Sequence, residues 1–271
     1  MTIADGVLDA RRFRSDYAAH RLAEGRAHSA EDMNRLPYLT TGPIARQWRV
    51  RARSFDALCR TVLAPLRALK GSPLSILDVG AGCSWLCYRA SLSGDTAVAL
   101  DIRDDSVDGL GAAAHYLVEQ PGRFGRVVGS FDALPLGQRR FDVAIFNASI
   151  HYAFNLATVL REAARVVSVG GRIVVLDSPF YASEAAGAAM VAEKRSEART
   201  RFGERASTLM APPFIEFLTS ERLAIAASGL GLEWRRHRVR YPIWYETRPL
   251  VALVRGRRQP SRFDLWESTV R

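Results

Sequence analysis

The chain has 271 residues, 48% of them hydrophobic and 24% charged, and a formal net charge of +10. This size and composition predict a globular protein with one large core, and they exclude a disordered or low-complexity chain. No apolar run approaches the ~18 residues that a membrane-spanning helix needs, and the N-terminus lacks the pattern of a signal peptide. The three cysteines form no Cys-x-x-Cys pair, so neither disulfides nor a metal site are expected. Together these features predict a cytoplasmic protein of bacterial type.

Arginine supplies 36 of the 38 basic residues, which is more typical of GC-rich codon usage than of selection for a polyanionic partner. The charge is nevertheless uneven, since ten arginines and only three acids occur from Arg235 to the end. Such a segment could contact nucleic acid or a membrane surface. A solvated basic face is the interpretation that we favour.

Residues 1–73 carry no strand-like alternation and are expected to form a helical lid. Within them, Arg46–Lys70 places apolar side chains at steps of three and four, the pattern of an amphipathic helix. Pro65 lies inside this stretch and is expected to kink or divide it. Trp48 is a candidate for contact with a ligand, although packing of Trp48 and Phe55 beneath the lid is the simpler interpretation.

From residue 74 onward, strand and helix patterns alternate, which predicts an α/β domain over 74–271 with a doubly wound, mostly parallel sheet. The seven expected strands cover 75–79, 96–101, 126–130, 141–146, 171–177, 232–240 and 262–269. The expected helices cover 84–92, 108–119, 155–168 and 183–205, with one that begins after Thr219 as its cap and another around 245–256. Residues 178–218 interrupt the alternation after the fifth strand. This helical insertion is expected to cover a substrate, because ligands bind at the carboxyl edge of such sheets.

The most informative stretch is the junction between the first strand and the first helix of this domain. The strand carries Asp78 near its end and runs into Gly80-Ala81-Gly82. Glycines there allow a sharp turn and let a ligand approach the backbone amides at the start of the helix. Asp101 follows 19 residues after Gly82 and ends the second strand, where a carboxylate can accept both hydroxyls of a ribose.

Two residues argue against a dinucleotide as the ligand. The dinucleotide fingerprint requires glycine or alanine where this chain has Trp85. Asp78 would repel a pyrophosphate, whereas it suits a ligand that carries an ammonium group. Ser84, at the third position of the glycine motif, is still suitable as a helix N-cap.

An acid-x-Gly-x-Gly motif followed by an acid at the end of the second strand resembles the S-adenosylmethionine site of class I methyltransferases, of the small-molecule, type 11-like kind. The resemblance covers about residues 74–177 and involves several ordered motifs. It implies a seven-stranded Rossmann-like fold, S-adenosyl-L-methionine as the cofactor and S-adenosyl-L-homocysteine as the product. It also implies methyl transfer to a small-molecule acceptor, with natural products and lipid-like molecules as candidates.

By the same resemblance, the methionine end of the cofactor would contact Asp78 and the backbone of Gly80-Ala81-Gly82. The ribose would bind Asp101, and the adenine would lie against Ile102. Asn147, after the fourth strand, is a further candidate for cofactor binding.

The loop Gly129–Pro135 resembles the family's adenine-edge loop, but the acid of that motif is replaced here by Ser130. Adenine selectivity would then depend on backbone groups of Phe131 or on Asp132. A turn-stabilising role for Asp132 is an equal alternative.

The segment Asn147-Ala-Ser-Ile-His-Tyr152 lies where members of this family bring catalytic or substrate-binding groups beneath the methyl group. His151 is the candidate general base, because the ordinary pKa of histidine lies near neutrality; lining of the pocket is the alternative. Asp177 is expected to orient His151 or to bind a substrate hydroxyl. The candidates for an aromatic substrate wall, with core packing as the alternative, are Tyr152, Tyr181, Trp244 and Tyr245.

Two alternative functions stay open at this point: an RNA methyltransferase that uses the basic C-terminal region, and a protein that binds the cofactor without transferring its methyl group. An exocyclic-amine methyltransferase would carry Asn/Asp-Pro-Pro-aromatic where this chain has Asn147-Ala-Ser-Ile150. A carbon-5 pyrimidine enzyme would need a cysteine beyond Cys87. Nucleic acid is therefore a disfavoured partner. The sequence indicates neither the methylated atom nor the oligomeric state.

Overall fold

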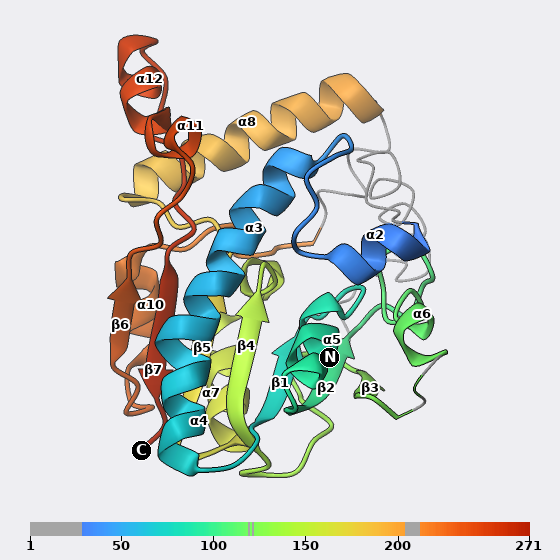
Figure 1. Ribbon diagram of the computed structural model, residues 1–271. Helices are drawn as coiled ribbons and strands as arrows, with labels where there is room; N and C mark the ends of the chain where they lie inside the picture. The colour runs from blue at the N-terminus through green and yellow to red at the C-terminus, as the bar shows by residue number, and fades with distance from the viewer. Residues whose placement is uncertain (1–28, 119, 121, 204–211) are drawn as a thin grey trace.

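The computed structural model describes residues 29–118, 120, 122–203 and 212–271. They form one seven-stranded sheet in the order β3-β2-β1-β4-β5-β7-β6, with helices on both of its faces (Figure 1). Only β7 runs antiparallel to its neighbours, and the other adjacent pairs are parallel. This confirms the predicted doubly wound, mostly parallel sheet.

The strands are short and mostly buried. They are β1 (Ser75–Val79), β2 (Thr96–Asp101), β3 (Gly125–Val128), β4 (Phe141–Asn147), β5 (Val167–Leu176), β6 (Trp234–His237) and β7 (Leu265–Thr269). The helices are α2 (Ala30–Arg35), α3 (Ala45–Leu58), α4 (Ala64–Lys70), α5 (Trp85–Leu92), α6 (Ala114–Leu117), α7 (Leu156–Val166), α8 (Glu184–Phe202), α10 (Ser220–Ala227), α11 (Ile243–Glu246) and α12 (Arg248–Val254). A π-helical turn, Cys59–Leu63, and a 3-10 turn, Ile150–Tyr152, complete the set.

Five strands, β3 to β7, differ from their predicted bounds, and the differences in β5 and β6 have identifiable reasons. β5 begins at Val167, four residues earlier than predicted, because pairing with β4 extends through the glycine turn. The predicted strand 232–240 shortens to Trp234–His237. The backbone N–H of Val239 donates to the Asp264 side chain (3.2 Å) rather than to a neighbouring strand.

The predicted helix over 108–119 is wrong: only Ala114–Leu117 is helical. The preceding residues form turns, because the backbone N–H groups of Val107 and Asp108 both donate to Asp105 Oδ1 at 3.0 Å. Such side-chain hydrogen bonds compete with helix formation. The predicted cap at Thr219, in contrast, is confirmed, since its side chain accepts a hydrogen bond from the third residue of α10.

Pro65 divides the first long helix, as predicted. It lies in the first turn of α4, directly after the π-helical turn that joins α3 to α4. Proline has no amide hydrogen and its ring clashes with the preceding turn, so the regular hydrogen-bond ladder cannot continue through it. A π turn is one of the standard adjustments at such a point.

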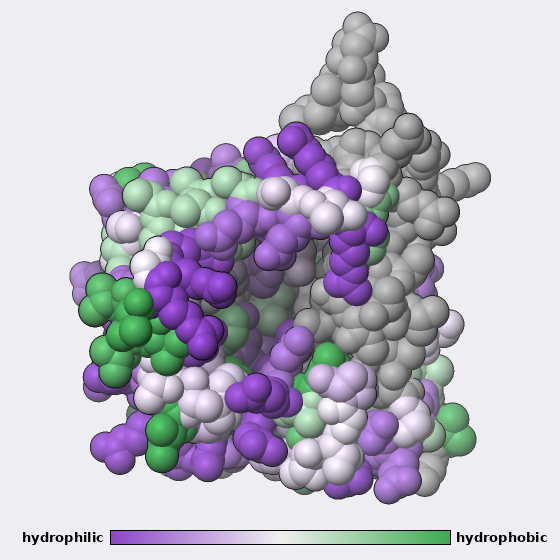
Figure 2. All heavy atoms as spheres, turned by 90° about the horizontal axis from the view of Figure 1, so that it is seen from above, coloured by the Kyte–Doolittle hydropathy of each residue, from purple (hydrophilic) through white to green (hydrophobic). Residues whose placement is uncertain are grey.

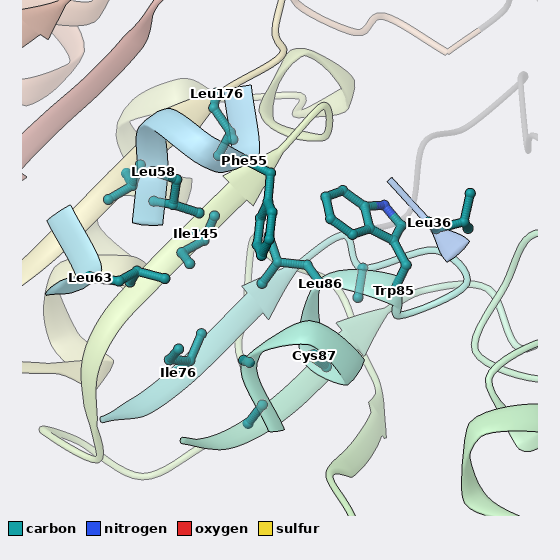
Figure 3. Packing of buried hydrophobic residues seen from close by; sticks show 14 of the residues in the cluster. Leu36, Phe55, Leu58, Leu63, Ile76, Trp85, Leu86, Cys87, Ile145 and Leu176 are labelled. Carbon is teal, nitrogen blue, oxygen red and sulfur yellow. The ribbon is translucent and has the colours of Figure 1, made fainter. Parts of the chain in front are cut away.

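The helical segment before β1 is largely a core layer of the sheet. Leu58 and Leu63 pack in one buried cluster with Ile76 and Ile145 of the sheet (Figure 3). Only the N-terminal end of α3 rises beyond the carboxyl ends of the strands (Figure 1). Of the described residues before β1, only that end could cover a ligand, so the lid stays a prediction. Residues 1–28 lie outside the described part of the chain.

Trp85 anchors α3 to the glycine-loop helix α5. Its ring makes edge-on contacts with Trp48 (centroids 5.9 Å apart) and Phe55 (5.4 Å), both of which are buried on α3. Figure 3 shows Phe55 pointing from α3 toward Trp85. The interpretation that Trp48 and Phe55 serve packing is confirmed.

We expect Trp85→Ala to lower the free energy of unfolding by about 3–5 kcal/mol, because it removes a buried aromatic side chain and leaves a cavity between two helices. The measurement is urea unfolding followed by circular dichroism. Leu92→Ala, an exposed position on the same helix, is the control and should change stability by less than ~0.5 kcal/mol. Equal effects of the two substitutions would contradict this account of the anchor.

Candidate active site

Acidic and amide side chains meet at the carboxyl edge of the sheet. Asp78, Asp101, Asn147 and Asp177 each lie at or just beyond the carboxyl end of a parallel strand. Viewed from above, the molecule is hollowed near its centre and hydrophilic side chains gather around the hollow (Figure 2). A crevice at this edge is where ligands bind in open α/β sheets.

Asp78 is the most perturbed of these acids. Its side chain is buried, and Oδ1 has no hydrogen-bond partner among the described residues. Burial, and after it the charge of Asp101, raise the pKa of Asp78 to about 8. The Cys87 thiol, with Sγ 4.0 Å from Oδ2, is a weak donor to the other oxygen. A buried carboxyl with one oxygen unpartnered is stabilised in its charged form by a cation. The position therefore suits a ligand with an ammonium group.

The glycine loop beside Asp78 brings the backbone close to a side chain from β4. Gly80 has φ +75°, and a Cβ there would lie 2.4 Å from Ser149 Cβ. The Ser149 hydroxyl donates to the Val79 carbonyl (2.5 Å), which fixes it in that place. The amides of Gly80 and Ala81 both donate to the Leu100 carbonyl. The loop can therefore adopt this conformation only because residue 80 has no side chain.

Asp101 is held by backbone amides on either side. Gly82 N donates to its Oδ2 (2.8 Å) and Arg103 N to its Oδ1 (2.9 Å). Burial raises the pKa of Asp101 despite these bonds. A carboxylate has about four acceptor sites, so two are left for ribose hydroxyls. Ile102, the next residue, is exposed and can cover an aromatic ring.

Ser130 and Asp132 form a closed turn. Asp132 N donates to Ser130 Oγ, and Ser130 Oγ donates to Asp132 Oδ2, both at 3.2 Å. Phe131 packs against the core. This geometry favours the turn-stabilising role for Asp132, while the residue that contacts adenine stays a prediction.

The prediction that the Ser84 side chain caps the N-terminus of α5 is wrong. Ser84 occupies the cap position of α5, but its φ is 62° and its side chain caps no amide. The hydroxyl instead donates to the Gly82 carbonyl at 3.4 Å. The first amides of α5 therefore have no serine cap in front of them.

Asp177 belongs to a hydrogen-bonded chain that reaches α3. Ser54 makes a short hydrogen bond with Asp177 Oδ1, and the hydroxyl oxygens of Ser54 and Tyr241 are 2.8 Å apart. The Tyr241 hydroxyl also donates to the Phe263 carbonyl (2.5 Å). Since Ser54 and Tyr241 carry one hydroxyl proton each, all three contacts are hydrogen bonds only when Asp177 is protonated. Burial agrees, because it raises the pKa of Asp177 to about 6 against the opposing effects of Arg51 and Ser54.

His151 has a different partner. Its Nδ1 lies 3.3 Å from Ser178 Oγ, and its ring packs against Tyr152 with centroids 4.3 Å apart. Asp177 is hydrogen-bonded to Ser54, and the expected orientation of His151 by Asp177 stays a prediction. Binding of a substrate hydroxyl by Asp177 stays a prediction, as does the base role of His151.

The four aromatic candidates do not form one wall. Trp244 and Tyr245 contact each other (5.9 Å), and Tyr245 also packs on Tyr241, beside the Asp177 chain. The other two have separate partners: Tyr152 packs on Phe214 at 5.5 Å, and Tyr181 packs on Phe217 at 5.8 Å. The buried Tyr245 hydroxyl and the Asn147 Oδ1 have no partner among the described residues, so both are available to a ligand.

Sequence reasoning missed Ser54, Ser149 and Tyr241. Ser54 and Tyr241 are separated from Asp177 and from each other by 64 to 187 positions, and nothing in the local pattern connects them. The sequence gives only a weak indication of the role of Ser149, because a small residue after a strand can face the glycine loop of the neighbouring strand.

The part of the chain that the structure describes contains no helix long and apolar enough to cross a membrane. Within the same residues, no cluster of three or more histidine, cysteine or acidic side chains could hold a metal ion.

Residues 77–175 match the family model described as "Methyltransferase domain". This matched region, about a third of the chain, contains the end of β1, the glycine loop, β2 and β4, so the part of the chain that carries the candidate site is similar to a methyltransferase domain. Two curated relatives are similar to it: a malonyl-[acyl-carrier protein] O-methyltransferase of Methylococcus capsulatus, 29% identical over 161 residues (52% of this chain, 56% of the relative), and a ubiquinone/menaquinone biosynthesis C-methyltransferase of Methylobacterium nodulans, 26% identical over 140 residues (51% and 52%). The chain thus spans about half the length of these relatives.

A solved structure shares the fold across the whole chain. It is the 1,6-didemethyltoxoflavin-N1-methyltransferase of Burkholderia thailandensis, crystallised with 1,6-didemethyltoxoflavin and S-adenosylhomocysteine. It is 17% identical, with a TM-score of 0.55, and the comparison covers 100% of this chain and 92% of that one.

We expect Asp78→Asn to raise the free energy of unfolding of the ligand-free protein by more than ~1 kcal/mol at pH 8.5, and by much less at pH 5. The folded state keeps the Asp78 proton up to about pH 8, whereas the unfolded chain loses it near pH 4. Stability from this group is therefore complete below pH ~4 and is lost as the pH rises through 8. Urea unfolding of both proteins across this range is the measurement, and an effect of Asp78→Asn that does not change with pH would contradict it.

Proposed function

We propose that this protein is an S-adenosyl-L-methionine-dependent methyltransferase that acts on a small-molecule acceptor and releases S-adenosyl-L-homocysteine. The observation that carries the proposal is the buried carboxyl of Asp78, whose Oδ1 has no partner among the described residues, beside a glycine loop and near Asp101. The matched methyltransferase domain and the relatives' activities support it.

The residues present fit this cofactor. Asp78 would bind its ammonium group, and the space that a Cβ at Gly80 would fill lets the methionine end approach the backbone. Asp101 would accept the ribose hydroxyls through its two remaining acceptor sites, with Ile102 against the adenine. Asn147 Oδ1, buried and without a partner among the described residues, would accept a further hydrogen bond.

The cofactor supplies a methyl group that its sulfonium already activates. The chain therefore has to hold the acceptor in line at near-contact distance and exclude water. His151 takes the acceptor's proton, and Ser178 orients its ring. Asp177 and Tyr245 bind polar groups of the acceptor. The N-terminal end of α3 acts as the lid and 74–271 as the catalytic domain, with α8 in the covering insertion.

The acceptor is a small molecule rather than nucleic acid. The relatives act, by their names, on malonyl-[acyl-carrier protein] and on intermediates of ubiquinone and menaquinone biosynthesis, and the solved structure on 1,6-didemethyltoxoflavin. Half of the arginines from Arg235 onward are paired with acids of the same chain; they are Arg236, Arg238, Arg258, Arg262 and Arg271. This internal pairing weakens the case for an RNA substrate. We place the enzyme in the cytoplasm of a bacterium.

Asp101→Ala should lower the affinity for S-adenosyl-L-homocysteine by about 10–100-fold, because it removes a charge-assisted bidentate acceptor from the ribose. Isothermal titration calorimetry is the measurement, with NAD as the control ligand. Asp104→Ala, an exposed acid three residues away, is the matched control and should bind as the wild type does. Absence of binding to the wild type, or binding unaffected at Asp101, would reject the cofactor site.

His151→Ala should lower kcat for an accepted substrate by about 10²-fold and leave cofactor affinity unchanged, because a general base acts on the acceptor only. The assay follows S-adenosyl-L-homocysteine release with a panel of hydroxylated, carboxylated and quinone-like acceptors. If His151 only lines the pocket, KM will rise while kcat stays near the wild-type value.

A further inference from the structure

The helical hairpin of residues 243–258, which contains α11 and α12 and is called here the α11–α12 tip, projects from the body beyond α8 (Figure 1). No side chain of α12 is buried. Five large apolar residues of the tip are exposed, namely Ile243 (82%), Leu250 (63%), Val251 (44%), Leu253 (76%) and Val254 (80%). Figure 2 shows apolar side chains gathered at the left edge of the molecule, where Figure 1 places this hairpin.

This exposed apolar patch is continuous, unlike the scattered apolar residues of an ordinary protein surface. Residues 250–254 are apolar without interruption, so Arg248 at its start is the one charged residue of α12. A helical turn whose residues are all apolar is normally buried against another surface. A contiguous exposed apolar patch on a soluble protein indicates an interaction site. The tip therefore has a partner in its working state.

The charge next to the tip indicates the kind of partner. Residues 243–262 contain five arginines and one acid, Glu246, which gives a net charge of +4. Arg255 and Arg257, at the end of α12, are exposed and make no ion pair with any described residue. An apolar tip with unpaired arginines at its base complements a surface that is apolar inside and negatively charged outside.

Among possible occupants, this pattern fits a lipid bilayer better than a second copy of the chain. A stable dimer interface uses about 20–30 residues on each side, more than the tip provides. A symmetric contact between two tips would also bring the same arginines together. A bilayer requires only that apolar side chains enter by about 5–10 Å while arginines stay among the headgroups. We propose that the α11–α12 tip docks this protein on an anionic membrane surface.

The inner side of the hairpin leads to the active site. Arg46 of α3 lies over the Trp244 ring (4.6 Å), and Tyr245 packs on Tyr241, which continues through Ser54 to Asp177. Docking would therefore place the side of the active-site crevice that carries Trp244 and Tyr245 next to the lipid surface. Binding to a bilayer does not require methyl transfer, so it can be tested apart from the proposed function.

The test is co-sedimentation of the full-length protein with vesicles of phosphatidylglycerol and phosphatidylcholine, and with vesicles of phosphatidylcholine alone. We expect binding to the anionic vesicles that weakens with added salt. Leu253→Glu combined with Val254→Glu should lower binding by about tenfold or more, since it places charges in the inserted turn. Leu92→Glu with Ile225→Glu, at exposed apolar positions outside the tip, is the control with the same charge change and should bind as wild type.

A second pair of variants tests the charge. Arg255→Glu with Arg257→Glu should weaken binding, whereas Arg60→Glu with Arg161→Glu, both exposed elsewhere, should not do so to the same extent. Circular dichroism confirms that each variant is folded. The proposal is overturned if the wild type does not bind anionic vesicles, or if tip and control variants bind equally. It is also overturned if the wild type is a dimer by analytical ultracentrifugation that the Leu253 and Val254 changes convert to monomer, because a second copy then covers the tip.

Discussion

The buried carboxyl of Asp78 is the constraint around which the carboxyl edge of the sheet is arranged. Burial with one oxygen unpartnered and without a countercharge is costly, and the folded chain avoids part of this cost by keeping the group protonated to about pH 8. Neighbouring segments hold the glycine loop in place: Ser149, two residues after β4, lies against Gly80, and Asp101 at the end of β2 accepts from the amide of Gly82. A cationic ligand group would reduce this cost, so the ligand-free site favours the binding of such a group.

The position of helix α3 over the sheet depends in turn on Trp85. At the position where a dinucleotide site needs a small residue, this chain has a large ring that two aromatic side chains of α3 pack against. The same helix carries Ser54, which holds Asp177 at the end of β5. Trp85 thus packs against the same helix that holds Asp177, so the glycine-loop helix and the end of β5 are joined through α3.

Much of this arrangement could be predicted from the sequence, because it depends on local pattern. β1 and β2 have their predicted bounds, since each is a short, mostly apolar segment with an acid at or next to its carboxyl end. The helix expected over 108–119 failed because one side chain, Asp105, offers the backbone an alternative set of hydrogen bonds. The chain from Asp177 through Ser54 to Tyr241 could not be predicted, because it joins three elements that only the tertiary fold brings together. The exposure of α12 was equally hidden, since an apolar run in a sequence is ordinarily a buried one.

Proton release on cofactor binding tests the central claim most directly. Calorimetric titration of S-adenosyl-L-homocysteine at pH 7, in two buffers with different ionisation enthalpies, counts the protons exchanged. If a ligand ammonium group converts protonated Asp78 to its anion, about one proton should be released for each ligand bound, and Asp78→Asn should release none. Binding without proton release by the wild type, or equal release by both proteins, would contradict the role assigned to Asp78.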